Sequence, residues 1–315
     1  MSPIGLGLAA LGRPGYINLG RAEDFHGDRG VDAMERRCHA MLDAARAAGV
    51  RYIDAARSYG LAETFLAHWL DARAIEPGAL TIGSKWGYTY TADWRPDAAV
   101  HEVKNHSLET LRRQLAETRA LLGDRLSLYQ IHSATLESGV LRDRHVLEEL
   151  ARLAADGLTI GLSVSGPRQA DTIRCALSVD IDGVNPFRCV QATWNVLEPS
   201  AGPALSEARD RGWQVIVKEG VANGRLTDRA SGPHIEIMRG IALELGAHVD
   251  AIALAAVLAQ SWVGTALSGA VTREQLASNL TAVDLRLTPD HLQTLAALAE
   301  APDQYWSVRG QLPWA

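Results

Sequence analysis

The chain has 315 residues and a formal net charge of −6, and 47% of its residues are hydrophobic. This length can bury a large core, either in one large α/β barrel or in two ordinary domains. Lysine and arginine are scattered rather than clustered, so the sequence predicts binding neither to nucleic acid nor to an anionic membrane surface. We therefore expect a protein that acts on a small molecule.

The cysteines and the apolar segments narrow the class of protein further. Cys38, Cys175 and Cys189 lie far apart and form no Cys-x-x-Cys pair, which argues against a disulfide framework and against a zinc site. The longest apolar run, 251–259, is about half of a membrane span, and no positive charge precedes the apolar stretch near the N-terminus. We expect a soluble, cytoplasmic chain with no membrane partner.

Strand-like and helix-like segments alternate along the chain. Short runs of β-branched or apolar residues are followed by longer amphipathic segments, a pattern typical of strand–helix units around a parallel sheet. After an opening strand in IGLGLAAL, strands are predicted at 51–54, 80–85, 126–131, 158–164, 188–193, 213–218 and 264–269. Helices are predicted at 33–49, 61–73, 105–122, 144–156, 167–178, 201–211, 249–260 and 273–283.

Eight such units without a linker between them predict one domain over residues 1–315. The expected fold is a (β/α)8 TIM barrel with extended loops after its strands and a C-terminal tail. The alternative, an open doubly wound sheet, usually carries a Gly-x-Gly-x-x-Gly turn in its first unit. The glycines at positions 5, 7 and 12 have the wrong spacing. They either let the strand twist or let the backbone approach a ligand, and Gly7 is assigned to the second role.

Four proton-handling side chains lie at or just after the ends of predicted strands. Asp54 ends the second strand, Tyr59 follows it, Lys85 ends the third strand and His132 follows the fourth. Strand ends of a parallel barrel share one rim, so we expect these groups to meet. A lysine ammonium would lower the pKa of the phenol, Asp54 would be its counter-charge, and His132 would bind a substrate oxygen.

This set of groups indicates carbonyl chemistry. The sequence contains no spacing that predicts a metal site and no nucleophile beside a base. No side chain can supply a hydride, so a nicotinamide cofactor would have to complete the chemistry.

The segments RYIDAARSYG, IGSKWG and LYQIHS resemble the aldo-keto reductase superfamily, and the resemblance extends from about residue 5 to residue 280. It implies a (β/α)8 barrel that binds a nicotinamide dinucleotide without a Rossmann fold. It also implies that Tyr59 is the general acid and base, that Lys85 and Asp54 adjust its acidity, and that His132 orients the substrate.

The resemblance also assigns residues to the nicotinamide end of the cofactor. Ser163 and Gln191 match the residues that hold the carboxamide, and Gly7 and Asp54 are placed beside them. Lys218 stands where an aromatic side chain commonly stacks on the ring. Because a cation beside an oxidised ring is unfavourable, we expect Lys218 to point elsewhere or to pair with an acid such as Glu219.

The adenosine end is assigned to the segment SGAVTREQLASN. Gly269 and Ala270 precede a helix whose N-terminus would attract an anion. Gln275 and Asn279 match residues that line the adenosine pocket. The Lys and Arg that clamp a 2′-phosphate in one branch of the family are replaced by Gly269 and Gln275, which leaves Arg273 as the local cation. The resemblance favours NADP(H), with NAD(H) as the alternative.

The substrate is the least defined part of the prediction. Tyr59, His132 and Trp86 are assigned to substrate binding, in an aromatic-lined site for a carbonyl compound or a sugar. Other aromatic residues expected over the site are Tyr88, Trp94, Tyr305 and Trp306. Three functions are considered: a carbonyl reductase, an aldose dehydrogenase that uses the same groups in oxidation, and a cofactor-binding redox sensor with little turnover. The sequence does not indicate an oligomeric state.

Overall fold

Eight parallel strands form a closed barrel in the computed structural model, which describes residues 2–19, 21–25 and 27–314. The strand order is β1-β10-β9-β8-β7-β6-β3-β2. The strands are β1 (Ile4–Gly7), β2 (Tyr52–Asp54), β3 (Thr81–Trp86), β6 (Leu126–Ala134), β7 (Thr159–Val164), β8 (Phe187–Thr193), β9 (Gln214–Lys218) and β10 (Thr265–Ser268). The predicted (β/α)8 barrel is therefore confirmed.

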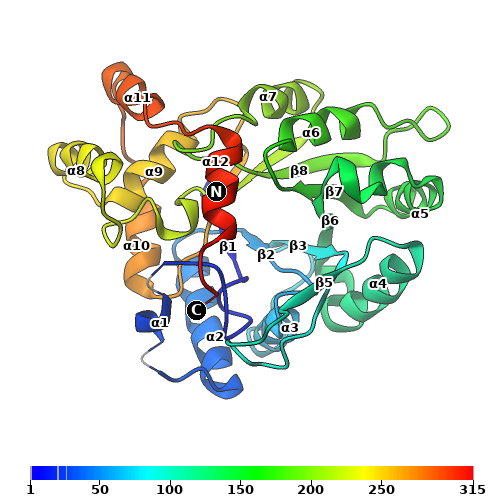
Figure 1. Cartoon of the computed structure of the whole chain (residues 1–315). Helices are drawn as coiled ribbons and strands as arrows, with labels where there is room; N and C mark the ends of the chain where they lie inside the picture. Colours follow the sequence, from blue (N-terminus) through cyan, green and yellow to red (C-terminus); the bar gives the residue numbers. More distant parts are fainter. Residues whose placement is uncertain (1, 20, 26, 315) are drawn as a thin grey trace.

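Helices surround the barrel in Figure 1 and join successive strands. The predicted helices correspond to α2 (Val31–Ala47), α3 (Ala62–Ala72), α4 (Leu108–Leu122), α5 (Arg144–Ala155), α6 (Gln169–Leu177), α7 (Gly202–Asp210), α9 (Val249–Leu258) and α10 (Arg273–Thr281). Helix α4 begins three residues later than predicted because the Ser107 side chain accepts a hydrogen bond from the Thr110 N–H and so caps the helix at that point.

Further elements, which the sequence did not predict, lie in the loops and in the C-terminal segment. They are α1 (Arg21–Asp24), the antiparallel pair β4 (Tyr88–Tyr90) and β5 (Glu102–Lys104), α8 (Pro233–Leu245), α11 (Pro289–Ala296) and α12 (Pro302–Gly310). Short 3-10 helices are η1 (Gly123–Arg125), η2 (Leu136–Ser138), η3 (Val140–Arg142) and η4 (Ala222–Gly224). Helix α12, red in Figure 1, crosses in front of the strands.

The barrel interior is filled by side chains. Tyr52, Leu128, Cys189 and Ile216 form one buried cluster although they come from β2, β6, β8 and β9. Strands β2, β6 and β8 are not neighbours in the barrel, so their side chains meet inside it, as in the layered cores of such barrels. The Tyr52 hydroxyl donates to Asp54 Oδ1 at 3.0 Å. This layer therefore lies directly under the strand ends that carry the candidate site.

One observation concerns membrane spans. Within residues 2–19, 21–25 and 27–314, no single helix is both long and apolar enough to cross a bilayer, although α8 and α9, bent by 86° at their junction, pass by length and composition when taken together.

Candidate active site

The four side chains predicted to form a proton-transfer unit lie together. Lys85 Nζ donates to Asp54 Oδ2 at 2.5 Å, to the Ala55 carbonyl at 2.9 Å and to the Tyr59 hydroxyl oxygen at 3.2 Å. The His132 ring lies edge-on to the Tyr59 ring, with centroids 5.4 Å apart. Lys85 is fully buried and Asp54 is 2% exposed. The lysine therefore connects the carboxylate to the phenol in a site shielded from water.

Two glycines position the loop that carries Tyr59. Gly60 has φ +61°, and a Cβ there would lie 2.5 Å from the Gly12 carbonyl oxygen. A Cβ on Gly12 would lie 2.4 Å from the Tyr59 carbonyl oxygen. The Leu61 N–H donates to the Gly12 carbonyl at 2.8 Å. The loops after β1 and β2 thus approach each other at a distance that only glycine allows, which holds Tyr59 over the barrel.

Asp54 is held by hydrogen bonds from three directions. Besides Lys85, it accepts from the Tyr52 hydroxyl and from Gln191 Nε2 at 2.8 Å. Gln191 lies on β8, so this bond crosses the barrel. The resemblance assigned Gln191 to a cofactor carboxamide, and in the structure its amide nitrogen binds Asp54. A buried carboxylate held by these donors fixes the position of the Lys85 side chain.

The acidity of Tyr59 differs from the sequence-based expectation. Burial, with a further contribution from the Asp54 charge, raises the pKa of Tyr59 well above its ordinary value, although Arg13 acts in the opposite direction. The lysine was expected to lower this pKa, but burial raises it. The phenol therefore keeps its proton at neutral pH. An ammonium cannot accept a hydrogen bond, so the Tyr59 hydroxyl does not donate its proton to Lys85.

The His132 side chain is held as a neutral ring. Burial, followed by the charge of Lys85, lowers the pKa of His132 well below its ordinary value. Its Nδ1 lies 3.3 Å from Ser58 Oγ, and the Tyr88 ring lies edge-on at 5.0 Å. A neutral imidazole has one N–H donor, and the neighbour of Nδ1 decides which nitrogen carries it.

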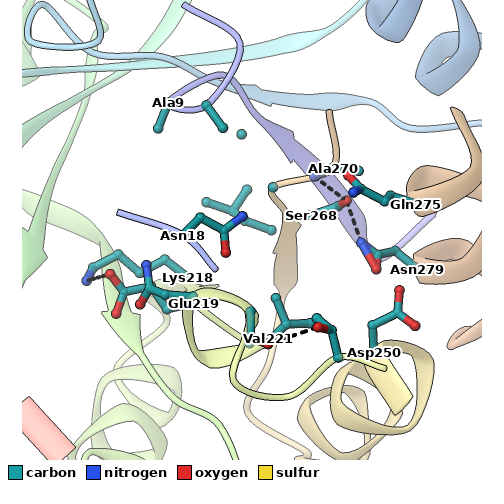
Figure 2. A pocket seen from close by; sticks show the side chains of 18 of the residues that line it. Ala9, Asn18, Lys218, Glu219, Val221, Asp250, Ser268, Ala270, Gln275 and Asn279 are labelled. Carbon is teal, nitrogen blue, oxygen red and sulfur yellow. Dashed lines mark hydrogen bonds and ion pairs between the residues drawn. The ribbon is translucent and has the colours of Figure 1, made fainter. Parts of the chain in front are cut away.

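A cleft of about 340 Å³ extends from Asp54 and Tyr59 to helix α10. Figure 2 shows Lys218 and Glu219 on one side of it and Gln275, Asn279 and Asp250 on the other. The lining includes most of the residues predicted to bind a cofactor: Gly7, Asp54, Gln191, Lys218, Gly269, Ala270, Gln275 and Asn279.

Two predicted cofactor residues do not line this cleft. Ser163 is buried, and its hydroxyl accepts a hydrogen bond from the Ser133 N–H at 2.8 Å. Arg273, the first residue of α10, is exposed. The cation expected to bind a 2′-phosphate is therefore not part of the cleft lining.

Backbone N–H groups just before α10 are hydrogen-bonded to nearby side chains. The Ala270 N–H donates to Ser268 Oγ at 3.3 Å, and the Val271 N–H donates to Gln275 Oε1 at 2.9 Å. Asn279 Nδ2 also donates to Ser268 Oγ, while Asn279 Oδ1 is buried with no hydrogen-bond partner among the described residues. This end of the cleft therefore offers an amide acceptor in addition to its helix terminus.

Several lining residues were not anticipated from the sequence. Asn18 and Asn223 each place a buried oxygen in the wall, and neither oxygen has a partner within the described part of the chain. Charged lining residues that were missed are Asp228, Arg229, Asp250 and Glu274. The stretch 219–247 was expected over the pocket, and the Asn-Gly pair of VANGRL, where Asn223 has φ +55°, is the turn signal that could have identified this residue.

Lys218 pairs with Glu219 as expected. Its Nζ lies 3.8 Å from Glu219 Oε1 and donates to Thr193 Oγ1 at 2.7 Å. Glu219 also accepts from Arg309 on α12, whose Nε lies 3.0 Å from both carboxylate oxygens. Burial lowers the pKa of Lys218 to about 8, while the charges of Arg309 and Lys218 overcome burial and lower the pKa of Glu219 to about 2.

The predicted aromatic residues have different roles. Tyr88 lies against His132, whereas Trp86 is fully buried and packs against His106 with centroids 5.6 Å apart. The Trp94 indole donates to the Arg29 carbonyl at 2.8 Å, and the Tyr305 hydroxyl accepts from Asn195 at 3.0 Å. Trp306 lies next to Lys218, whose Nζ is 5.7 Å from its ring centroid. The Tyr88 ring therefore packs on one of the four central residues, His132.

Comparison with known proteins gives a consistent picture. Residues 3–300 match the model of the Aldo/keto reductase family. Protein tas of Escherichia coli strain K12 is 24% identical over 319 aligned positions, covering 85% of this chain and 91% of that protein.

Solved structures share the fold. Aldo-keto reductase AKR11C1 from Bacillus halodurans, in its holo form, superposes with a TM-score of 0.70 at 20% identity, covering 95% of this chain and 92% of the other. The protein PA4992 of Pseudomonas aeruginosa gives a TM-score of 0.63 at 23% identity, covering 93% and 91%.

Proposed function

Since the chain belongs to the aldo/keto reductase family of oxidoreductases, we propose that it reduces an aldehyde or ketone to an alcohol with a nicotinamide dinucleotide as hydride donor. Tyr59 is the general acid. The observation that supports this most directly is the buried Lys85, which contacts both Asp54 and Tyr59 at the end of a long cleft.

The cleft suits a dinucleotide. Its lining includes Asn18, Asn223 and Asn279. Each of these has a buried side-chain oxygen with no hydrogen-bond partner among the described residues. Such acceptors match the hydroxyl groups of ribose and the amino group of adenine, which are hydrogen-bond donors. When bound, the cofactor supplies the hydride that no side chain can supply.

The protein groups then handle the proton. Tyr59 keeps its proton at neutral pH and donates it to the substrate oxygen as negative charge develops there. The phenolate that remains is stabilised by the Lys85 ammonium, 3.2 Å away. If Ser58 donates to Nδ1 of His132, the neutral ring carries its N–H on Nε2 and can donate to the same oxygen.

For the cofactor we propose a preference for NAD(H), whereas the family resemblance favoured NADP(H). Arg229 lines the cleft, but its guanidinium donates to the Asp24 carboxylate. Gln275 Nε2 also donates to this carboxylate, at 3.0 Å. Asp250 and Glu274 add carboxylates to the lining. An additional phosphate would enter a region of negative charge, whereas a ribose diol would find acceptors.

A cofactor titration followed by a substrate panel tests the function. We expect the reduced dinucleotide to bind, as monitored by fluorescence, and turnover on at least one aldehyde or ketone. Oxidation of aldose sugars without any carbonyl reduction would support the aldose dehydrogenase instead. Tight cofactor binding without turnover on either panel would support the redox sensor, and absence of cofactor binding would refute all three proposals.

A further inference from the structure

Lys218 is a buried cation at the catalytic end of the cleft, and the proton-transfer scheme does not use it. It ends β9, and its side chain is 16% exposed. Asp54, Tyr59 and Gln191 line the same end of the cleft. The nearness of Lys218 is also reflected in His132, whose pKa is lowered in part by the Lys218 charge.

The positive charge of Lys218 is only partly compensated. Its ammonium donates to the neutral Thr193 hydroxyl, and its nearest carboxylate, Glu219, is also bound by Arg309. One carboxylate thus serves two cations. Asp54 is likewise occupied by Lys85. Counting these groups, three cations face two carboxylates, which leaves an excess of one positive charge.

Hydride chemistry requires the nicotinamide ring to approach this charge. The carbon that receives the hydride is bonded to the oxygen that contacts Tyr59, and reacting atoms must lie about 3–3.5 Å apart. The ring must therefore enter the part of the cleft that Tyr59 and Lys218 both line. An oxidised ring carries a positive charge and a reduced ring is neutral, so Lys218 interacts differently with the two forms.

We propose that Lys218 makes this site select the oxidation state of its cofactor, with the reduced dinucleotide bound more tightly than the oxidised one. The inference rests on the proposed function, since it requires a nicotinamide cofactor. A like charge a few Å away in a partly buried site corresponds to a difference of about tenfold in affinity or more.

The selection has a consequence for the reaction at the site. In the oxidative direction, an alcohol would give a hydride to the oxidised ring when it is bound and its hydroxyl proton to the phenolate form of Tyr59, leaving a carbonyl compound, the reduced ring and a protonated Tyr59. Lys218 disfavours the bound state that contains the alcohol and the oxidised ring. It therefore shifts the equilibrium between bound species toward the carbonyl compound and the reduced ring. It also weakens binding of the oxidised cofactor and so favours its release. Both effects make the reduced form the favoured bound form between turnovers.

The selection should depend on pH in one direction. Burial lowers the pKa of Lys218 to about 8, so its ammonium is present below that pH and is lost above it. Glu219, with a pKa of about 2, and Arg309, whose pKa is raised by Glu219, keep their charges across this range. Tyr59 stays protonated and His132 stays neutral. The preference for the reduced form should therefore weaken as the pH rises through about 8.

The test measures dissociation constants of NADH and NAD⁺, and of NADPH and NADP⁺, by calorimetry at pH 7 and pH 9.5. In Lys218→Gln we expect the ratio of oxidised to reduced dissociation constants to fall about tenfold at pH 7, mainly through tighter binding of the oxidised form. Lys218→Arg should retain the ratio. Arg273→Gln removes an exposed cation outside the cleft and is the matched control.

The outcomes separate this inference from the proposed function. If the wild-type protein binds neither form of either cofactor, the proposed function fails. If both forms bind but the ratio is the same in Lys218→Gln and wild type, or falls equally in Arg273→Gln, the role of Lys218 is refuted. If Lys218→Gln does not fold, the wild-type protein still provides the test. A ratio of oxidised to reduced dissociation constants that is the same at pH 7 and pH 9.5 contradicts the inference.

Discussion

At the scale of single residues, the site depends on one fully buried ammonium. Lys85 has no access to water, and its charge is matched by Asp54, which Tyr52 and Gln191 hold in place. An ion pair in such surroundings is stable only when both partners are present and their remaining hydrogen bonds are made. Tyr59 is therefore the member that can be changed with the least structural damage.

Replacing Tyr59 by Phe removes the proton donor and keeps the ring. We expect kcat on the best carbonyl substrate to fall by at least about 10², as general acid catalysis commonly contributes, with cofactor affinity nearly unchanged. Steady-state kinetics and fluorescence titration measure the two quantities. Tyr16→Phe, which removes another phenol that lines the cleft, serves as the control. Activity of Tyr59→Phe within a few-fold of wild type would show that another group is the acid.

Replacing Lys85 by Met removes the cation that favours the phenolate. The pKa of Tyr59 is already raised by burial, and we expect it to rise further. The alkaline limb of the rate profile, which reports loss of the phenol proton, should move to higher pH. Loss of the partner also leaves Asp54 buried and unpaired, at a cost of about 3–5 kcal/mol in unfolding free energy.

The double variant Lys85→Met with Asp54→Asn separates these two effects. It removes the unpaired charge, so it should recover a large part of the stability without restoring the activity. Urea unfolding and the pH–rate profile give the two readouts. A profile that does not move in Lys85→Met would contradict contact between this lysine and the phenol in solution.

At the scale of elements, Arg309 ties helix α12 to the end of β9. Its side chain binds both oxygens of Glu219, a residue with φ +57° at which the chain turns sharply after the strand. Trp306 on the same helix lies beside Lys218. The position of α12 in front of the barrel in Figure 1 thus depends on an ion pair at the cleft wall.

We predict that Arg309→Gln lowers the free energy of unfolding by about 1.5–3 kcal/mol at pH 7, because a buried carboxylate loses the hydrogen bonds of one of its two cations and keeps Lys218. Glu219 has a depressed pKa of about 2 in the folded state, so its contribution is fully present above the unfolded value of about 4.3. It is lost as the pH falls from that value toward about 2. Urea unfolding at pH 7 and pH 3 should show a smaller difference between wild type and Arg309→Gln at the lower pH; an equal difference at both would argue against the ion pair.

The start of α10 provides a test of cofactor choice. Glu274 lines the cleft and Arg273 does not, although they are neighbours. Removing one carboxylate in Glu274→Gln should tighten NADPH binding about threefold, the size expected of one exposed charge, and leave NADH binding unchanged. Arg273→Ala should change neither. If Arg273→Ala weakens the binding of NADPH but not of NADH, the arginine binds the 2′-phosphate.

At the scale of the whole molecule, barrel closure brings distant segments into one site. The hydrogen bond between Gln191 and Asp54 joins residues 137 positions apart, and the bond between Gln275 and Asp24 joins residues 251 positions apart. Strands β2, β3, β6, β8 and β9 each contribute a residue to the catalytic end of the cleft or its immediate surroundings. A small change in register at any of these strands would separate these groups.

The sequence by itself determined the barrel and the central four residues. The alternation of strand and helix periods identifies eight units, and residues at the ends of parallel strands share a rim whatever their loops do. This is why the sequence alone predicts that Asp54, Lys85 and His132 lie at one rim. Tyr59 was identified by its short distance in sequence from Asp54 and by the family resemblance.

Tertiary structure alone decided which neighbours each of these residues has. Burial by surrounding elements raises the pKa of Tyr59. No local sequence pattern predicts how deeply the side chain is buried. Ser163 and Trp86 were assigned to ligands; in the structure both are buried, Ser163 accepts from the Ser133 N–H and Trp86 packs on His106. Asn18 and Asn223, whose oxygens have no hydrogen-bond partner in the described part of the chain, come from segments that follow different strands, β1 and β9. Their meeting depends on barrel closure, because contacts between distant loops have no periodic signal in the chain.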